Sequence, residues 1–175
     1  MVEPDWNLTN RKHTMESDQR RRRIKQLANM RAHLAELTVL CGRTVNEREL
    51  LSLDRTEEVL SLRRQHPLGN KRSFEMNFSD LKSERFTRYI DKLSLASQGA
   101  VFLWIKHSLD CGSLELPSIA NINFNFGFKD LPSALFSVWT TSFEDYVVFD
   151  FDENEDQQRI VEIGVEGVHW PLVEY

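Results

Sequence analysis

Residues 134–164, ALFSVWTTSFEDYVVFDFDENEDQQRIVEIG, decide the fold of this chain. Aromatic and β-branched residues alternate with polar ones over 134–143, 146–151 and 158–164, which predicts three strands. The polar segment DENEDQQ, residues 152–158, separates the last two and predicts a hairpin turn between them. Successive strands without intervening helices favour an antiparallel meander.

Three other segments extend the predicted sheet. Residues 100–107, AVFLWIKH, are apolar on both faces and predict a central strand, in which Trp104 packs in the core as Trp139 does on its own strand. Residues 73–78, SFEMNF, and 121–128, NINFNFGF, alternate with period two. In the second of these, Asn121, Asn123 and Asn125 would share one face.

The rest of the chain has helical periodicity. Residues 17–41 predict one long helix with an apolar stripe of Leu27, Met30, Leu34, Leu37 and Cys41, preceded by Ile24 and stopped at Gly42. A second helix is expected from Thr44, whose spacing to Glu47 matches a capping box, and a further one from Asp54. A last helix is expected from Ser79 or Asp80 to about Ser97. The fold class is therefore α+β, with N-terminal helices followed by a helix and an antiparallel β-meander sheet.

Charge divides the chain in the same way as periodicity does. Residues 1–72 hold 15 Lys and Arg against 10 Asp and Glu, whereas residues 73–175 hold 7 against 17. We predict a flexible arm at 1–15, a basic helical region at 16–72 and an acidic α+β domain at 73–175, with the boundary in HPLGNKR, residues 66–72. The two halves either face different partners or face each other.

Composition excludes several protein classes. Two cysteines, Cys41 and Cys111, are too few for a disulfide framework or a four-ligand zinc site. The chain has no 18-residue apolar run, so no membrane partner is expected, and its N-terminus lacks the apolar region of a secretory signal. We therefore expect a cytoplasmic protein with free thiols.

The hairpin turn concentrates negative charge. It brings together Asp150, Asp152, Glu153, Glu155 and Asp156, with Glu144 and Asp145 shortly before them. A calcium loop is not expected, because Glu155 stands where such a loop needs glycine and Val161 where it needs a bidentate glutamate. These residues are either a solvated tip or a partner-binding surface, and a patch of this kind would steer a basic protein towards it.

Two further features are candidates for contact with a partner. The row of Asn121, Asn123 and Asn125 is unusual in a strand, because Asn is depleted there, so it marks either a solvated face or a polar binding surface. Trp170 precedes Pro171 near the C-terminus. An exposed tryptophan at this position would be a candidate interface anchor.

Catalytic chemistry has little support in the sequence. His107, Asp110 and Cys111 lie close together, but nucleophile, base and acid usually converge from distant segments, so an ordinary loop is the favoured reading. No histidine pair has metal-ligand spacing, and no phosphate-binding or nucleophile-elbow motif occurs. We expect no catalytic residue, no metal and no cofactor, and therefore no enzyme.

The basic block Arg20–Lys25, with Arg63 and Arg64, supports a rival hypothesis. Such clusters bind phosphate backbones, so a nucleic-acid-associated regulatory protein is the alternative function. No aromatic residue interleaves with the block, which also fits a solvated helix face or docking onto an acidic protein surface.

The stretch FSVWTTSFEDYVVFDFDENEDQQRIVEIGVEGVHWPL resembles bacterial immunity proteins of polymorphic and contact-dependent growth inhibition toxin systems. The resemblance covers roughly residues 100–175 and is one of general character, so no individual functional residue is carried over. It implies a small cytoplasmic α+β antitoxin that occludes the active site of a cognate toxin domain. Under this hypothesis the acidic surface covers a basic partner.

Overall fold

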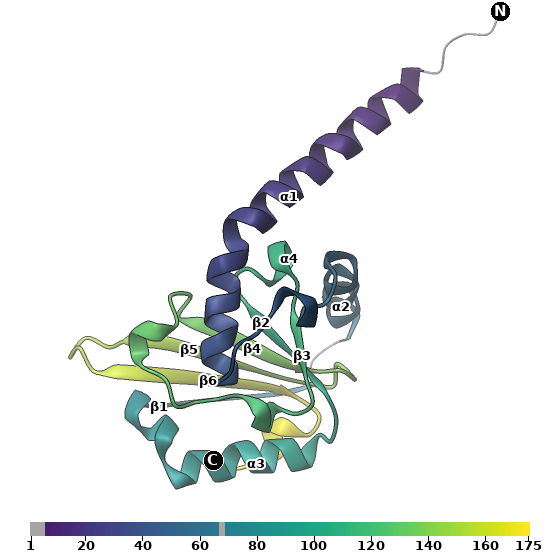
Figure 1. Ribbon diagram of the computed structural model, residues 1–175. Coiled ribbons are helices and arrows are strands. Elements are labelled where there is room, and N and C mark those ends of the chain that lie inside the picture. The colour runs from purple at the N-terminus through teal and green to yellow at the C-terminus, as the bar shows by residue number, and fades with distance from the viewer. Residues whose placement is uncertain (1–5, 67–68) are drawn as a thin grey trace, which may run out of the picture.

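The computed structural model describes residues 6–66 and 69–175, with side chains from Gln19 onward (Figure 1). It confirms an α+β fold in which helices precede a six-stranded antiparallel sheet. The helices are α1 (Trp6–Cys41), α2 (Leu53–Gln65), α3 (Glu84–Ala96) and α4 (Ser108–Cys111). The strands are β1 (Asn70–Asn77), β2 (Val101–Ile105), β3 (Leu114–Leu116), β4 (Leu135–Thr140), β5 (Asp145–Glu153) and β6 (Arg159–Gly167).

The strands lie in the order β1-β6-β5-β4-β2-β3, and every neighbouring pair is antiparallel. The predicted hairpin between residues 146–151 and 158–164 is confirmed as β5 and β6, and β4-β5-β6 form the expected meander. The strand predicted at 100–107 is also confirmed, because β2 lies between β4 and β3. The short β3 and the place of β1 beside β6 carry no sequence signal of their own.

Two apolar layers cover the sheet. Its inner face buries Val147, Phe149 and Ile163 against α3 and the C-terminal half of α1, whose Leu37 and Leu40 are fully buried. On the opposite face, Val59 of α2 packs on Phe102 and Trp139. The main core therefore joins residues of the basic helical region to the acidic domain, across the boundary that charge and turn residues predict.

Helix α1 is longer than the sequence predicts. It begins at Trp6, so residues 6–15 are helical rather than part of a loose arm, while residues 1–5 of that expected arm lie outside the described residues. Its N-terminal half projects away from the body of the molecule, and its C-terminal half packs on the sheet (Figure 1). Gly42, with φ +62°, ends the helix as predicted and donates its N–H to the carbonyl of Val39 at 3.2 Å.

Helix starts differ from their predicted positions. The turn after α1 is a 3-10 helix, η1 (Glu47–Glu49), in which the Asn46 N–H donates to the Glu49 carboxylate at 2.9 Å, so the Thr44 capping box is wrong. Ser52 rather than Asp54 caps α2, and Ser83 rather than Ser79 or Asp80 caps α3 after the 3-10 helix η2 (Phe78–Lys82). In each case a serine one residue before the helix accepts a main-chain N–H that would otherwise lack a partner.

The strand predicted at residues 121–128 is wrong. This segment is a loop between the 3-10 helices η3 (Ile119–Asn121) and η4 (Phe128–Asp130), and it pairs with no strand. Ile122 and Phe126 still enter the core, which explains the alternating pattern. The last short helix is η5 (Trp170–Leu172). Within the described chain, no helix combines the length and apolarity that crossing a bilayer requires.

Candidate interaction surface on the outer face of the sheet

The face of the sheet opposite α1 and α3 is only partly covered. Helix α2 packs over β2 and β4, and beyond it side chains of β5, β6 and β1 point outward. We call this surface the outer face; its exposed or half-buried side chains beyond α2 are Lys71, Ser73, Glu75, Asn77, Leu135, Tyr146, Val148, Asp150, Asp152, Ile160, Glu162 and Glu166. On this part of the sheet, strand register rather than helix packing decides which side chains are exposed.

Strand register aligns three carboxylates across the outer face. Glu75 of β1 lies directly opposite Glu162 of β6, which lies directly opposite Asp150 of β5. All three residues are exposed. Like charges placed directly opposite in adjacent strands are destabilising, by about 0.2–1 kcal/mol per pair. The folded protein therefore holds a carboxylate row that weakens its own sheet.

An aromatic group lies on the same face of the sheet as the carboxylate row. Trp104 and Trp139 stack with ring centroids 4.6 Å apart, and the Arg63 guanidinium lies 5.8 Å from the Trp139 ring and 5.3 Å from the Tyr146 ring. Burial raises the pKa of the Tyr146 phenol, so this side chain stays a neutral hydrogen-bonding group. Trp104 and Tyr146 are half-buried and thus offer apolar surface beside the acidic residues.

A row of mostly small residues lies between the Trp139–Tyr146 pair and the carboxylates, and this row ends at Trp104. One row across the strands runs through Ser73, Gly164, Val148 and Ser137. A Cβ added at Gly164 would come within 3.0 Å of Val148 Cγ1, so any larger residue here would require Val148 to shift. The outer face therefore combines aromatic side chains, a central row of mostly small residues, and a row of carboxylates.

The β5–β6 hairpin extends this acidity beyond the sheet. Asp150, Asp152, Glu153, Glu155 and Asp156 are all exposed, as is Glu144 at the other end of β5. The turn is held by Asn154, whose side-chain oxygen accepts the N–H groups of Asp156 at 3.1 Å and Gln158 at 2.9 Å. Among the residues that the structure describes, no cluster of three or more His, Cys, Asp or Glu side chains is arranged to hold a metal ion.

Asp145 and Trp170 do not lie on this surface, so their predicted exposure is wrong. Asp145 is 1% exposed, and its Oδ1 accepts the N–H groups of His169 at 2.7 Å and Trp170 at 2.9 Å. Its Oδ2 lies 2.9 Å from His169 Nδ1. Trp170 is fully buried, and its Nε1 donates to the Leu93 carbonyl at 3.0 Å. Both residues attach the C-terminal segment to the core.

The predicted asparagine row is also wrong, because its members do not share a strand face. Asn123 receives the C-terminus of α1: its main-chain N–H donates to the Leu40 carbonyl at 2.7 Å and its Nδ2 to the Val39 carbonyl at 2.9 Å. Asn121 is exposed at the end of η3, and Asn125 is exposed in the loop that follows. A helix C-terminus leaves carbonyls without partners of its own. Asn123 gives the Leu40 carbonyl a donor and gives the Val39 carbonyl a second donor beside the Gly42 N–H.

The His107, Asp110 and Cys111 group has structural roles at the junction of α1 and α4. Asn29 Nδ2 donates to Asp110 Oδ2 at 3.0 Å, and His107 Nδ1 lies 4.0 Å from the same oxygen. Cys111 is buried, and burial raises the pKa of its thiol to about 11. A thiol with this pKa is protonated at neutral pH and is a poor nucleophile.

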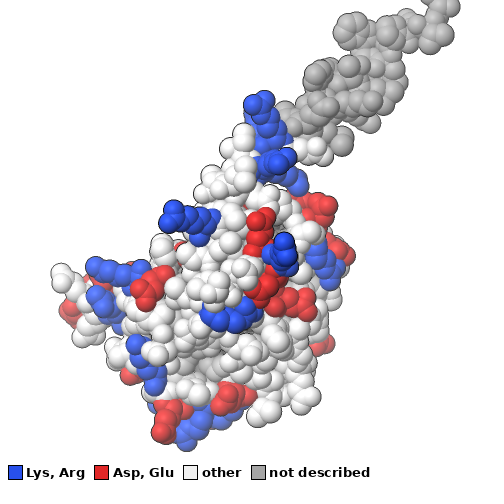
Figure 2. Space-filling model, in the orientation of Figure 1, with Lys and Arg blue, Asp and Glu red and all other residues white. Residues whose placement is uncertain are grey.

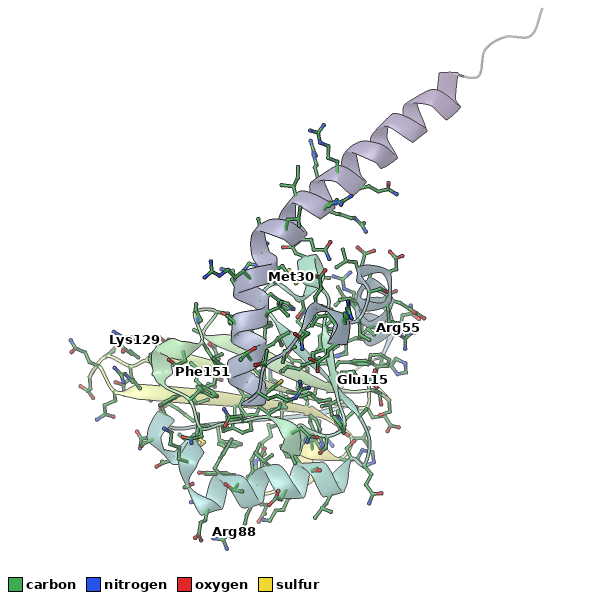
Figure 3. The ribbon with its side chains drawn as sticks, in the orientation of Figure 1. Met30, Arg55, Arg88, Glu115, Lys129 and Phe151 are labelled. Carbon is green, nitrogen blue, oxygen red and sulfur yellow. The ribbon has the colours of Figure 1, made fainter. Side chains whose placement is uncertain are left out.

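The basic block of α1 lies beside acidic residues of its own half of the chain. Arg22 pairs with Glu57 of α2 at 2.9 Å, and a groove of about 760 Å³ between α1 and α2 is lined by both charges, including Arg23, Glu47 and Asp54. Figure 2 shows basic side chains on the described end of α1 and acidic ones where the helix meets the body. The groove extends along α1 to Met30, which lies at the level of α4 (Figure 3). The described ion pair of this block is therefore formed with α2 and not with the acidic sheet.

No protein-family model, no curated protein and no solved structure matches this chain. The geometry of the outer face is therefore what supports a candidate function. Sequence reasoning found the hairpin carboxylates but missed Glu75 and Glu162, which strand register places in a row with Asp150. It also missed the contact of Arg63 with Tyr146, which arises because α2 packs on the sheet. The signal that could have shown it is the shared parity of Asp150 and Asp152 with each other and of Glu162 with Glu166.

Proposed function

We propose that this protein is a non-catalytic binding protein whose outer face covers a basic protein domain. The carboxylate row Glu75–Glu162–Asp150 is the observation that carries the proposal. Its cross-strand repulsion lowers the stability of the free protein, and cationic side chains of a partner would relieve it. A surface that lowers the stability of the free protein and gains favourable contacts in a complex is typical of a binding protein.

The aromatic group supports a protein partner. Tyr, Trp and Arg are the residue types enriched in the central contacts of protein interfaces, and Trp104, Tyr146 and Arg63 lie together beside the carboxylates. The hairpin carboxylates add a field that would speed the approach of a basic partner. Together with the resemblance to immunity proteins, this favours a cytoplasmic inhibitor that binds a cognate toxin domain over its active site.

Neutralisation of the outer face tests the proposal. The variant Asp150→Asn, Asp152→Asn, Glu162→Gln removes three charges while keeping side-chain shape. The tagged protein is bound to the basic protein that it retains from the source cell, and association is followed at low and moderate salt. We expect slower association and weaker binding for the variant, with a loss of salt dependence. Equal binding by wild type and variant would remove the outer face from the proposal.

The alternative is a nucleic-acid-associated role for Arg20–Lys25 on the projecting part of α1. Its supporting observation is the exposure of every basic side chain in this block: Arg20, Arg21, Arg22, Arg23 and Lys25. This alternative predicts retention of a DNA or RNA probe in a gel shift at low salt, with steep loss as salt rises. Absence of any shift at low salt would eliminate it.

A further inference from the structure

Strand β1 forms one edge of the sheet and pairs only with β6 among the described strands. Lys71, Arg72, Ser73 and Glu75 on this strand are exposed, and Phe74 is half-buried on the inner side. An edge strand presents main-chain N–H and carbonyl groups that another strand can bind. The side chains of β1 then determine which strand can pair with it.

Hydrogen bonds at both ends of the β5–β6 hairpin show which main-chain groups of β1 are free. Val168 N–H donates to the Glu144 carbonyl, and Asn154 N–H donates to the Gln158 carbonyl. In the register that links them, even-numbered residues of β6 bond to β5, so the odd-numbered residues bond to β1. Their β1 partners are even-numbered, and Lys71, Ser73 and Glu75 therefore direct their main-chain groups away from the sheet.

The charges of β1 select one register for pairing with a second copy. An antiparallel pair centred on Ser73 places each Lys71 directly opposite Glu75 of the other copy, on the same face. Shifting the centre to Glu75 or to Lys71 would place like charges opposite each other. Intermediate registers leave both charges opposite uncharged residues. The edge is therefore self-complementary in the register in which its outward main-chain groups also meet.

We propose that two copies of this protein associate through antiparallel β1–β1 pairing about a twofold axis at Ser73. Three residue pairs would exchange main-chain hydrogen bonds: Lys71 with Glu75, Ser73 with Ser73, and Glu75 with Lys71. Charged residues on an edge often repel other strands. Here they occur with opposite signs at positions that a twofold axis brings together, which favours a second copy over an unrelated strand.

Cross-linking at the axis tests the register. In the proposed dimer the Ser73 Cα atoms lie about 5.5 Å apart. That separation is within the range of about 4.4–6.8 Å that a disulfide spans. We expect Ser73→Cys to form a disulfide dimer under mild oxidation, whereas Lys71→Cys, whose two copies are about 13 Å apart along the strand, forms none. Absence of a Ser73→Cys dimer, or equal cross-linking by both variants, would overturn the register.

Charge exchange tests the contact without cross-linking. Lys71→Glu or Glu75→Lys places like charges in both symmetry-related pairs, and each is expected to raise the dimer dissociation constant by about tenfold. The double variant, Lys71→Glu with Glu75→Lys, restores opposite charges and is expected to recover dimerisation. Glu166→Gln is the control, because it removes the ion pair of Lys71 within its own chain, at 3.2 Å, and leaves the edge intact.

Sedimentation equilibrium over a range of concentrations provides the measurement. A monomer at every concentration would contradict the proposal, as would a dimer that the single charge reversals leave unchanged. Circular dichroism on each variant shows that it is folded before association is compared. Ser73→Cys and Lys71→Glu leave the carboxylate row Glu75–Glu162–Asp150 unchanged, whereas Glu75→Lys alters it. The first two variants therefore separate failure of the dimer from failure of the proposed partner binding.

Discussion

At the scale of single residues, Glu162 shows how binding and stability oppose each other. It lies between Glu75 and Asp150, so it takes part in two like-charge pairs. We predict that Glu162→Gln raises the free energy of unfolding by about 0.2–1 kcal/mol, measured by urea denaturation. Glu115→Gln is the matched control, because Glu115 is also exposed on this side of the sheet but lies opposite Phe102. Equal effects of the two changes would contradict the account of the row.

His33 makes stability depend on pH. It is fully buried, its Nε2 donates to the Gly112 carbonyl at 2.8 Å, and its Nδ1 has no partner. Burial lowers the pKa of its imidazole from 6.5 to about 4. The unfolded chain therefore binds the proton more readily than the folded one does, so stability is fully present above pH 6.5 and is lost as the pH falls towards 4.

The matching variant is His33→Gln, whose amide can still donate to the Gly112 carbonyl but does not titrate. We predict that the difference in unfolding free energy between wild type and this variant changes steadily in favour of the variant as the pH falls from 6.5 to 4. Urea denaturation at several pH values measures it. A difference that stays constant over this range would show that His33 titrates alike in both states.

Asp145 illustrates a buried charge that holds two segments together. It accepts two main-chain N–H groups at the start of η5 and contacts His169 Nδ1. Removal of its carboxylate in Asp145→Ala leaves those N–H groups without partners, and we predict a loss of at least about 2 kcal/mol in the free energy of unfolding. Denaturation followed by tryptophan fluorescence checks it. A loss below about 0.5 kcal/mol would mean that water replaces the carboxylate at no cost.

At the scale of elements, the end of α1 depends on a residue 84 positions after Val39. Asn123 binds the carbonyls of Val39 and Leu40, whereas Asn125 is exposed and only its main-chain N–H bonds to the Asn123 side chain. We predict that Asn123→Ala lowers the free energy of unfolding by about 1 kcal/mol and that Asn125→Ala changes it much less. Thermal unfolding compares the two, and equal losses would contradict the capping role.

The elements also show which parts of the fold the sequence can predict. Strand β5 was predictable because one of its faces is more deeply buried than the other, which favours alternation along the strand, and β6 largely follows the same pattern. Strand β4 is buried on both faces, and its aromatic and β-branched residues rather than alternation in burial mark it as a strand. Residues 121–128 alternate as well, yet Ile122 and Phe126 reach the core from a loop. Periodicity therefore predicts which side chains are buried. It does not predict which segments pair as strands, because pairing depends on contacts between distant parts of the chain.

The candidate site was predictable to the same partial extent. The hairpin carboxylates are contiguous in sequence, so they were found, but Glu75 and Glu162 join Asp150 only through the register of three strands. Asp145 was misplaced because a carboxylate at a strand start gives no sign that distant main-chain N–H groups will enclose it. Trp170 was misplaced for a similar reason, since its hydrogen-bond acceptor lies on α3.

At the scale of the whole molecule, charge is arranged by surface rather than simply by halves of the chain. The basic residues of α1 lie beside the acidic residues of α2, with Arg22 paired to Glu57, while the outer face keeps its carboxylate row across three strands. The outer face thus remains available to a partner. Pairing of β1 with a second copy would continue the sheet and leave this face on the same side of both copies.

The central claim is that the outer face binds a basic protein. Its most direct test is a quantitative pull-down from the source cell, comparing wild type with the variant Asp150→Asn, Asp152→Asn, Glu162→Gln. A matched variant, Glu57→Gln, Glu58→Gln, Glu84→Gln, removes the same number of exposed charges from α2 and α3. We predict that wild type and the matched variant retain the same basic protein and that the outer-face variant loses it. Equal recovery of that protein by all three would contradict the claim.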